Sequence, residues 1–290
     1  MVGDEIEIIE KAPAKINLGL DVLYKREIDG YHELEMVMSS VDLADRLIFE
    51  EIPENKILIE TNKAFLPIDK RNNVYQAASI IKQRYGITKG LKISIEKNIP
   101  VAAGLGGGSS DCAAALRGMN RLWNLNLSME ELIEIGVTIG TDVPYCLYGT
   151  TAFIAGKGEI VQALVPMPQC WVVLVKPRIS VSTRKIFQQV SKIDELSHPD
   201  MASLSQAILA QDYEEMLCHM GNSLEDITIP KYPVVQQIKD RMIKYGADIA
   251  LMSGSGPTVF ALCRQHSRAQ RIYNGLKGFC EEVYLVRTLK

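Results

Sequence analysis

The sequence predicts an α+β fold with many antiparallel strand pairs. Extended apolar runs precede the first helical pattern, and a polar turn containing Asp29 and Gly30 separates two of them. Near the C-terminus, residues 249–252 and 258–263 flank a glycine turn and form a second strand–turn–strand pattern. Helical spacing of apolar residues lies between these groups. This mixture of hairpin-like strands and helices favours the α+β class.

The first half of the chain alternates between runs of strands and runs of helices. Strands are predicted at residues 6–9, 12–20, 33–41, 47–52, 56–60 and 91–96. Apolar residues at 74, 77, 78 and 81 indicate a helix over 73–85, and Gly86 stands where helices commonly end. A second helix is predicted to follow a glycine-rich loop and run to about residue 122. Ser128 and Glu131 form a capping-box pattern that opens a helix to residue 139, before a strand at 151–155.

A Pro-Met-Pro segment at 166–168 opens the second half. A strand is predicted at 171–176, a loop at 180–183 and a helix around 184–190. Residues 200–221 indicate one or two helices, and an amphipathic helix at 234–245 ends at Gly246. The strands at 249–252 and 258–263, a helix at 267–276 and a strand at 282–286 complete the prediction.

Composition and charge argue against several classes of protein. The 290 residues carry a formal net charge of −3, which argues against nonspecific binding to nucleic acid. The longest apolar runs have the length of strands, so no membrane span is expected. The six cysteines are scattered without a zinc-ligand spacing, and the acidic N-terminus lacks a secretory signal pattern. We therefore expect reduced thiols in a cytoplasmic protein. The sequence leaves both a monomer and a homodimer open.

The most informative segment is the glycine-rich loop at 100–111, which connects a strand to a helix. A backbone without Cβ atoms can close around phosphates, and the following helix start adds free N–H groups and a positive dipole end. Ser109, Ser110 and Asp111 are predicted to cap this helix, although their oxygens could equally face a metal ion. The loop is neither a P-loop nor a dinucleotide fingerprint, because it lacks the lysine of the first and the acidic residue of the second. A strained loop that merely needs glycine is the alternative.

Three further features favour phosphoryl transfer to an alcohol, which requires a positive charge and a group that orients or deprotonates the hydroxyl. Asp142 is a candidate base, and Lys15 lies in an apolar strand where lysine is rarely buried unpaired. The Lys15 ammonium could stabilise a developing alkoxide. The glycine turn at 254–256 could approach a ligand closely. Alternatively, Asp142 caps a helix and the turn is a plain β-turn.

Five segments, taken in order, resemble the GHMP kinases, a family that includes galactokinase, homoserine kinase, mevalonate kinase and phosphomevalonate kinase. They are residues 12–18, 29–34, 100–110, 140–144 and 253–257, and the resemblance covers nearly the whole chain. It implies a two-lobed fold with an ATP-binding, ribosomal-protein-like α+β domain at 1–165 and a ferredoxin-like α+β domain at 166–290. The active site would lie in the cleft between these domains.

The resemblance also implies ATP and Mg²⁺ as cofactors and a role for each matching residue. Asp142 is similar to the family's catalytic aspartate and Lys15 to the lysine beside it. Asn72 and Lys97 would lie near the adenosine. The triphosphate would be held by the loop residues Pro100, Gly104, Leu105, Gly106, Gly107, Gly108, Ser109 and Ser110, with Ser110 as the implied Mg²⁺ ligand.

The Asp-Gly-Tyr-His segment and the triple-glycine loop are most similar to family members whose small-molecule acceptor carries a cytidine diphosphate group. Tyr31 and His32 would handle the cytosine, with Phe187 as a second aromatic. This agrees with the chemistry, since a tyrosine can stack on a base and a histidine can bond its Watson–Crick edge. The remaining acceptor contacts would come from Asn17, Asp142, Thr183, Gly254, Ser255 and Gly256. Alternatively, Tyr31 covers the core beneath its hairpin and Phe187 packs in the core.

The resemblance therefore implies an ATP-dependent kinase for a tertiary hydroxyl of such an acceptor. One alternative is a GHMP kinase of the mevalonate or homoserine type, although those acceptors have no base for Tyr31 and His32. A second is a catalytically silent nucleotide-binding module, which would not need Lys15 or Asp142. Two positions depart from the family pattern: Cys112, expected to pack against the sheet, and Asp111, which could favour Mg²⁺ or cap the helix.

Overall fold

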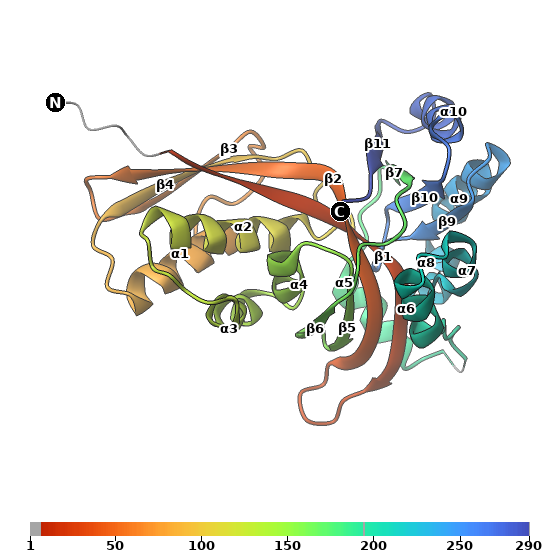
Figure 1. The fold of residues 1–290 in the computed structure, drawn as a ribbon, viewed down its shortest axis with the longest axis horizontal. Coiled ribbons are helices and arrows are strands. Elements are labelled where there is room, and N and C mark those ends of the chain that lie inside the picture. Colours follow the sequence, from red (N-terminus) through yellow and green to blue (C-terminus); the bar gives the residue numbers. More distant parts are fainter. Residues whose placement is uncertain (1–6, 194, 290) are drawn as a thin grey trace. The chain divides into compact units, whose positions relative to one another are not determined.

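The computed structural model describes residues 7–193 and 195–289, and the chain divides into two compact units (Figure 1). Unit 1 comprises the described residues of Met1–Ala14, Leu43–Ile99 and Gly106–Tyr148, and unit 2 those of Lys15–Asp42, Pro100–Leu105 and Gly149–Lys290. Neither unit is a continuous stretch, because strands β1 (Ile8–Lys25) and β2 (His32–Ile52) each run from one unit into the other. These units differ from the predicted division at residue 165, which stays a prediction.

Unit 1 combines strands with helices α1 to α4. Its strand order is β3-β4-β2-β1, with β3 (Ile57–Thr61) parallel to β4 (Gly90–Glu96) and β2 antiparallel to β4. The helices are α1 (Asn73–Arg84), α2 (Gly107–Leu122), α3 (Met129–Ile139) and α4 (Val143–Tyr148). Helix α2 approaches β2 closely, since a Cβ atom on Gly118 would lie 2.4 Å from the ring of Phe49. This close packing places the N-terminal turn of α2 at a fixed position relative to the strands of the same unit.

The helices of unit 1 begin and end where local chemistry dictates. Asn72 caps α1 by accepting a hydrogen bond from the Val74 N–H, and Gly86 beyond its end has φ +64°. Ser128 and Glu131 form the predicted capping box at the start of α3. Both signals are local in sequence, which is why these two predictions are confirmed.

Unit 2 contains two groups of hydrogen-bonded strands. In the first, the order is β8-β1-β2-β5-β6, where β8 (Gly221–Asn222) runs parallel to β1, and β5 (Ala152–Gly156) is antiparallel to both β2 and β6 (Ile160–Ala163). The second has the antiparallel order β11-β7-β10-β9, from β11 (Glu282–Arg287), β7 (Trp171–Lys176), β10 (Val259–Cys263) and β9 (Ile249–Met252). The helices are α5 (Thr183–Val190), α6 (Met201–Leu209), α7 (Tyr213–His219), α8 (Glu225–Lys231), α9 (Val234–Lys244) and α10 (His266–Lys277).

The structure confirms the predicted α+β class. Some strands predicted separately form one continuous strand, and the structure contains several elements that the sequence did not predict. The predicted strands 6–9 and 12–20 form the single strand β1, with Ile6 outside the described residues, and 33–41 and 47–52 form β2. Helix α4 and strands β6 and β8 are short and were not predicted. Helix α8 was also missed, because it contains Pro230, a residue that usually breaks helices.

The structure also shows the state of the cysteine thiols and the length of the helices. Each cysteine is a free thiol, and Cys112 is buried as expected, which raises its pKa to about 12. Within residues 7–193 and 195–289, none of the helices combines the length and apolar character needed to cross a bilayer.

Replacing Ser128 with Ala should lower the free energy of unfolding by about 1 kcal/mol, because the N–H of Glu131 loses its capping acceptor. Denaturant unfolding of the wild type and the variant measures the difference. Ser191→Ala, at the C-cap of α5, is the control and should leave stability nearly unchanged. Equal stability of Ser128→Ala and the wild type would contradict the capping role.

Candidate active site

The glycine-rich loop belongs to both units, and its second part starts helix α2 in unit 1. Gly106 takes a left-handed conformation with φ 69° at the N-cap, so α2 begins at Gly107, earlier than predicted. Ser109, Ser110 and Asp111 therefore lie inside the helix and do not cap it. The change has a physical cause, since a glycine in this conformation turns the chain into the helix without a side-chain cap. The first-turn N–H groups have no acceptors within the helix and suit an anion.

The first part of the loop lies against the 253–258 turn within unit 2. Gly104 has φ +76°, and a Cβ atom there would lie 2.3 Å from the backbone oxygen of Ser253. The Ser253 hydroxyl donates to the Gly104 oxygen at 2.9 Å, and the Thr258 N–H donates to the Ala103 oxygen at 3.4 Å. Gly104 is thus required by close contact between two backbones. Two segments that the sequence singled out separately are in contact.

Lys15 joins the same group of segments from strand β1. Its backbone N–H donates to the Leu105 oxygen at 3.0 Å, and its ammonium donates to the Asn17 side-chain oxygen at 2.6 Å. Both side chains are almost fully buried. The Asn17 amide is further held by the sulfur of Met36 at 3.6 Å, and a Cβ atom on Gly254 would lie 3.7 Å from Asn17 Oδ1. Asn17 therefore holds the Lys15 ammonium next to the 254–256 turn.

Asn222, a residue that sequence reasoning missed, secures the 254–256 turn. Its side-chain N–H groups donate to the backbone oxygens of Met252 and Gly254, each at 2.8 Å. Gly254 and Gly256 have φ values of 58° and 85°, which favour glycine. Nothing near Asn222 in the sequence marks it, because its partners lie about thirty positions away.

A second cluster in unit 2 contains the aromatic residues predicted for the acceptor. Thr183 at the start of α5 shares a hydrogen bond with Ser255 at 2.8 Å, which links α5 to the glycine turn. One turn further along α5, the Phe187 ring lies 5.4 Å from the His32 ring at an angle of 37°. Tyr31 is 54% exposed and so does not cover the core, and the Lys157 ammonium lies 5.0 Å from its ring. The structure thus pairs Phe187 with His32 directly.

His32 combines burial with an unused polar atom. Its Nε2 is buried and has no hydrogen-bond partner among the described residues. Burial, and then the nearby charge of Lys25, lower the pKa of His32 below its ordinary value of 6.5. The ring is therefore neutral at pH 7, and its nitrogen is available to a ligand group that can exchange a hydrogen bond with a neutral imidazole.

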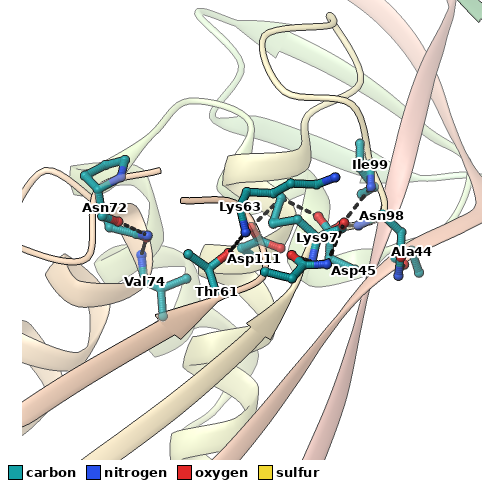
Figure 2. Close-up of polar contacts among 12 residues, drawn as sticks. Ala44, Asp45, Thr61, Lys63, Asn72, Val74, Lys97, Asn98, Ile99 and Asp111 are labelled. Carbon is teal, nitrogen blue, oxygen red and sulfur yellow. Dashed lines mark hydrogen bonds and ion pairs between the residues drawn. The ribbon is translucent and has the colours of Figure 1, made fainter. Parts of the chain in front are cut away.

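The residues predicted near adenosine are engaged with the protein itself in unit 1 (Figure 2). Both polar atoms of the Asn72 side chain are used, one by the Val74 N–H and one by the Pro67 oxygen. The Lys97 ammonium is buried between the carboxylates of Asp45 and Asp111. Any contact of these two side chains with a nucleotide would have to displace or share these bonds.

Asp111 neither caps α2 nor stands in open solvent. Burial raises the pKa of Asp111 to about 7, with Lys97 opposing the rise and Asp45 adding to it. Burial alone would lower the pKa of Lys97, but the charges of Asp111 and Asp45 outweigh it and the pKa is raised. Lys97 is therefore a permanently charged group at pH 7.

Ser110 and Asp142 also belong to unit 1. The Ser110 hydroxyl is buried and has no hydrogen-bond partner in the described part of the chain, which fits a phosphate or metal ligand. Asp142 directly precedes α4, and its backbone oxygen accepts from the Cys146 N–H at 3.1 Å. A Cβ atom on Gly140 would lie 3.7 Å from the Ser109 hydroxyl, so the turn that carries Asp142 adjoins the first turn of α2.

Family models match the chain in two places. The N-terminal domain of GHMP kinases matches residues 72–150, and the C-terminal domain matches residues 204–282. The chain belongs to the GHMP kinase family. As a GHMP kinase it is an ATP-dependent small-molecule kinase, and the resemblance seen in its motifs is confirmed.

Within the GHMP kinase family, the chain can be compared with individual kinases by sequence identity and by TM-score. The chain is 68% identical to the 4-diphosphocytidyl-2-C-methyl-D-erythritol kinase of Enterococcus faecalis, covering 98% of this chain and 100% of that one. It is 58% identical to a putative kinase of the same name from Streptococcus mutans, with the same coverage. A crystal structure of 4-(cytidine 5'-diphospho)-2C-methyl-D-erythritol kinase superposes with a TM-score of 0.83 at 31% identity, over 98% of this chain and 100% of that one. A homoserine kinase from Cytophaga hutchinsonii shares the fold, with a TM-score of 0.79 at 20% identity over 100% and 96% of the two chains.

The imidazole of His32 should titrate below pH 6.5, because burial and Lys25 both disfavour the protonated ring. NMR titration of the ring signals, assigned by their loss in His32→Gln, measures the midpoint. Lys25→Gln should move the midpoint upward by removing one of the two causes. A wild-type midpoint at or above 6.5 would contradict the environment described for this ring.

Proposed function

We propose that the protein transfers the γ-phosphoryl group of ATP to the 2-hydroxyl of 4-diphosphocytidyl-2-C-methyl-D-erythritol. The products are the 2-phosphate and ADP, in non-mevalonate isoprenoid precursor biosynthesis, with the protein in the cytoplasm. The observation that carries the proposal is the 68% identity to a kinase of that name over both full lengths. The pairing of His32 with Phe187 supports it, because mevalonate and homoserine offer no base to such rings.

The nucleotide would be held by the glycine-rich loop and the start of α2. The N–H groups from Gly106 to Ser109 suit the triphosphate, and the buried Ser110 hydroxyl suits a phosphate oxygen or Mg²⁺. Among the described residues no group of three His, Cys, Asp or Glu side chains could hold a metal ion alone. Bound Mg²⁺ would therefore keep water and phosphate oxygens as ligands, and would neutralise charge on the phosphates.

The reacting hydroxyl would be handled by two residues. Asp142 accepts or orients its proton while the oxygen attacks the γ-phosphorus and the bond to the ADP oxygen breaks. Lys15 supplies a positive charge that stabilises the developing alkoxide, and its bond to Asn17 keeps the ammonium in one position. Transfer is direct and in line, without a phosphorylated enzyme intermediate.

The acceptor would be recognised by residues of unit 2. The cytosine stacks on Tyr31 and bonds to His32, and the Phe187 ring lies 5.4 Å from the His32 ring. The turn at 254–256, with Ser255 bonded to Thr183, offers backbone N–H groups near the diphosphate or erythritol part. Asn17, whose oxygen is already engaged by Lys15, would contribute to the erythritol end mainly by holding that lysine.

ADP release from Mg·ATP, measured separately with each acceptor, tests this proposal. The panel consists of 4-diphosphocytidyl-2-C-methyl-D-erythritol, mevalonate, homoserine and galactose. We expect rapid turnover with the first compound alone. Turnover with one of the others would discard the cytidine pocket but keep the kinase, and binding of ATP without turnover on any would favour a silent nucleotide-binding module.

Replacing Asp142 with Asn should reduce kcat by about 100-fold or more, since general-base assistance is commonly of that size. The isostere keeps the shape of the side chain, so the Kd for ADP should stay within about twofold of the wild type. Steady-state kinetics and calorimetry give the two quantities. Near-normal turnover in this variant would remove Asp142 from the role of base.

Replacing Tyr31 with Ala should raise the KM for the cytidine acceptor by roughly tenfold or more, because base stacking on an aromatic ring contributes about 1–3 kcal/mol. The KM for ATP should change little. Tyr24→Ala is a matched control on the same hairpin, since Tyr24 is also exposed. Equal increases in both KM values, or the same effect in the control, would contradict stacking.

A further inference from the structure

Unit 1 contains a buried group of three ionisable side chains, Asp45, Lys97 and Asp111, which we call the charge cluster (Figure 2). Asp45 comes from strand β2, Lys97 directly follows strand β4, and Asp111 lies in the early part of α2. Asp45 is fully buried, and the other two are 5% exposed. No motif in the sequence contains Asp45, and the proposed catalytic steps do not use it.

Asp45 fixes the chain just before the glycine-rich loop. One carboxylate oxygen accepts hydrogen bonds from the N–H groups of Asn98 and Ile99, at 2.6 and 2.8 Å, and the other accepts from the Lys97 ammonium. Asn98 in turn donates to the Ala44 oxygen at 3.0 Å. A carboxylate that accepts three such bonds sets both the direction of this segment and its distance from β2.

Lys97 extends the same contact to the far end of the loop. Its ammonium donates to Asp111 Oδ2 at 2.6 Å, and a Cβ atom on Gly107 would lie 3.3 Å from the Lys97 nitrogen. Ile99, before the loop, lies 3.2 Å from the same Cβ position. The charge cluster therefore connects the residues that enter the loop with the helix turn that leaves it.

Burying these charges is costly, and a buried ion pair does not stabilise a fold more than apolar packing of the same volume would. Such a cluster is better explained by the position it imposes. We propose that Asp45 is a positioning residue for the nucleotide, acting through Lys97 and Asp111 to hold both ends of the phosphate loop at one spacing. Asp45 itself does not touch the nucleotide. The inference rests on the proposed use of this loop for ATP.

Calorimetric titration of the full-length protein with ADP tests the inference without the acceptor. Asp45→Ala should raise the Kd for ADP and the KM for ATP by roughly tenfold, while the KM for the acceptor stays within about twofold. Asp45→Asn retains an acceptor oxygen for the backbone N–H groups but loses the charge, so it should give an intermediate rise of at least about threefold. Asp42→Asn, an exposed carboxylate on the same strand, is the control and should change neither quantity.

Several outcomes would overturn the inference. One is a Kd for ADP in Asp45→Asn that lies within about twofold of the wild-type value. This result would refute the positioning role even if the alanine variant fails to fold. Another is an equal rise of both KM values, which would indicate a general structural loss. Failure of the proposed function looks different, because it would appear in the wild type as no turnover with the cytidine acceptor, whatever the ADP affinities of the Asp45 variants.

Discussion

The contact on which the rest of the site depends is the close approach of two backbones at Gly104. The Ser253 oxygen occupies the space of a side chain on residue 104, and the Ser253 hydroxyl and Thr258 N–H bond to the adjoining oxygens. Lys15 reaches the same stretch through the Leu105 oxygen. Because backbone positions are difficult to shift in a packed interior, residues 100–105 of the glycine-rich loop and the 253–258 turn, which both belong to unit 2, hold one another in place.

The chemistry of the site follows from how each charge is buried. The Lys15 ammonium donates to the Asn17 amide oxygen at 2.6 Å, which fixes its position next to the 254–256 turn. The Lys97 ammonium is buried between two carboxyl groups, so its charge is paired within the protein. We therefore propose different functions for these two buried lysines: Lys15 acts on the reacting hydroxyl, and Lys97 holds the glycine-rich loop.

Local signals made most of the fold predictable, and nonlocal contacts account for what was missed. The helix end at Gly86, the capping box at Ser128 and the turn at Asp29 and Gly30 depend on neighbours within a few positions, and the sequence predicts them. Asp45 and Asn222 could not be found this way, since their partners lie more than twenty-five positions away, and nothing near them marks the role. The predicted helix cap at Asp111 is wrong, because Asp111 lies inside α2 and its carboxylate bonds to Lys97, which belongs to another element.

Gly104→Ala tests the central claim that the nucleotide loop and the acceptor turn depend on one backbone contact. Calorimetry should show weaker binding of both ADP and the cytidine acceptor in this variant, since the added Cβ would displace Ser253 together with the loop. Gly278→Ala, where an added Cβ meets nothing within 4 Å and φ is −76°, should leave both affinities unchanged. Unchanged affinity for either ligand in a folded Gly104→Ala protein would contradict the claim.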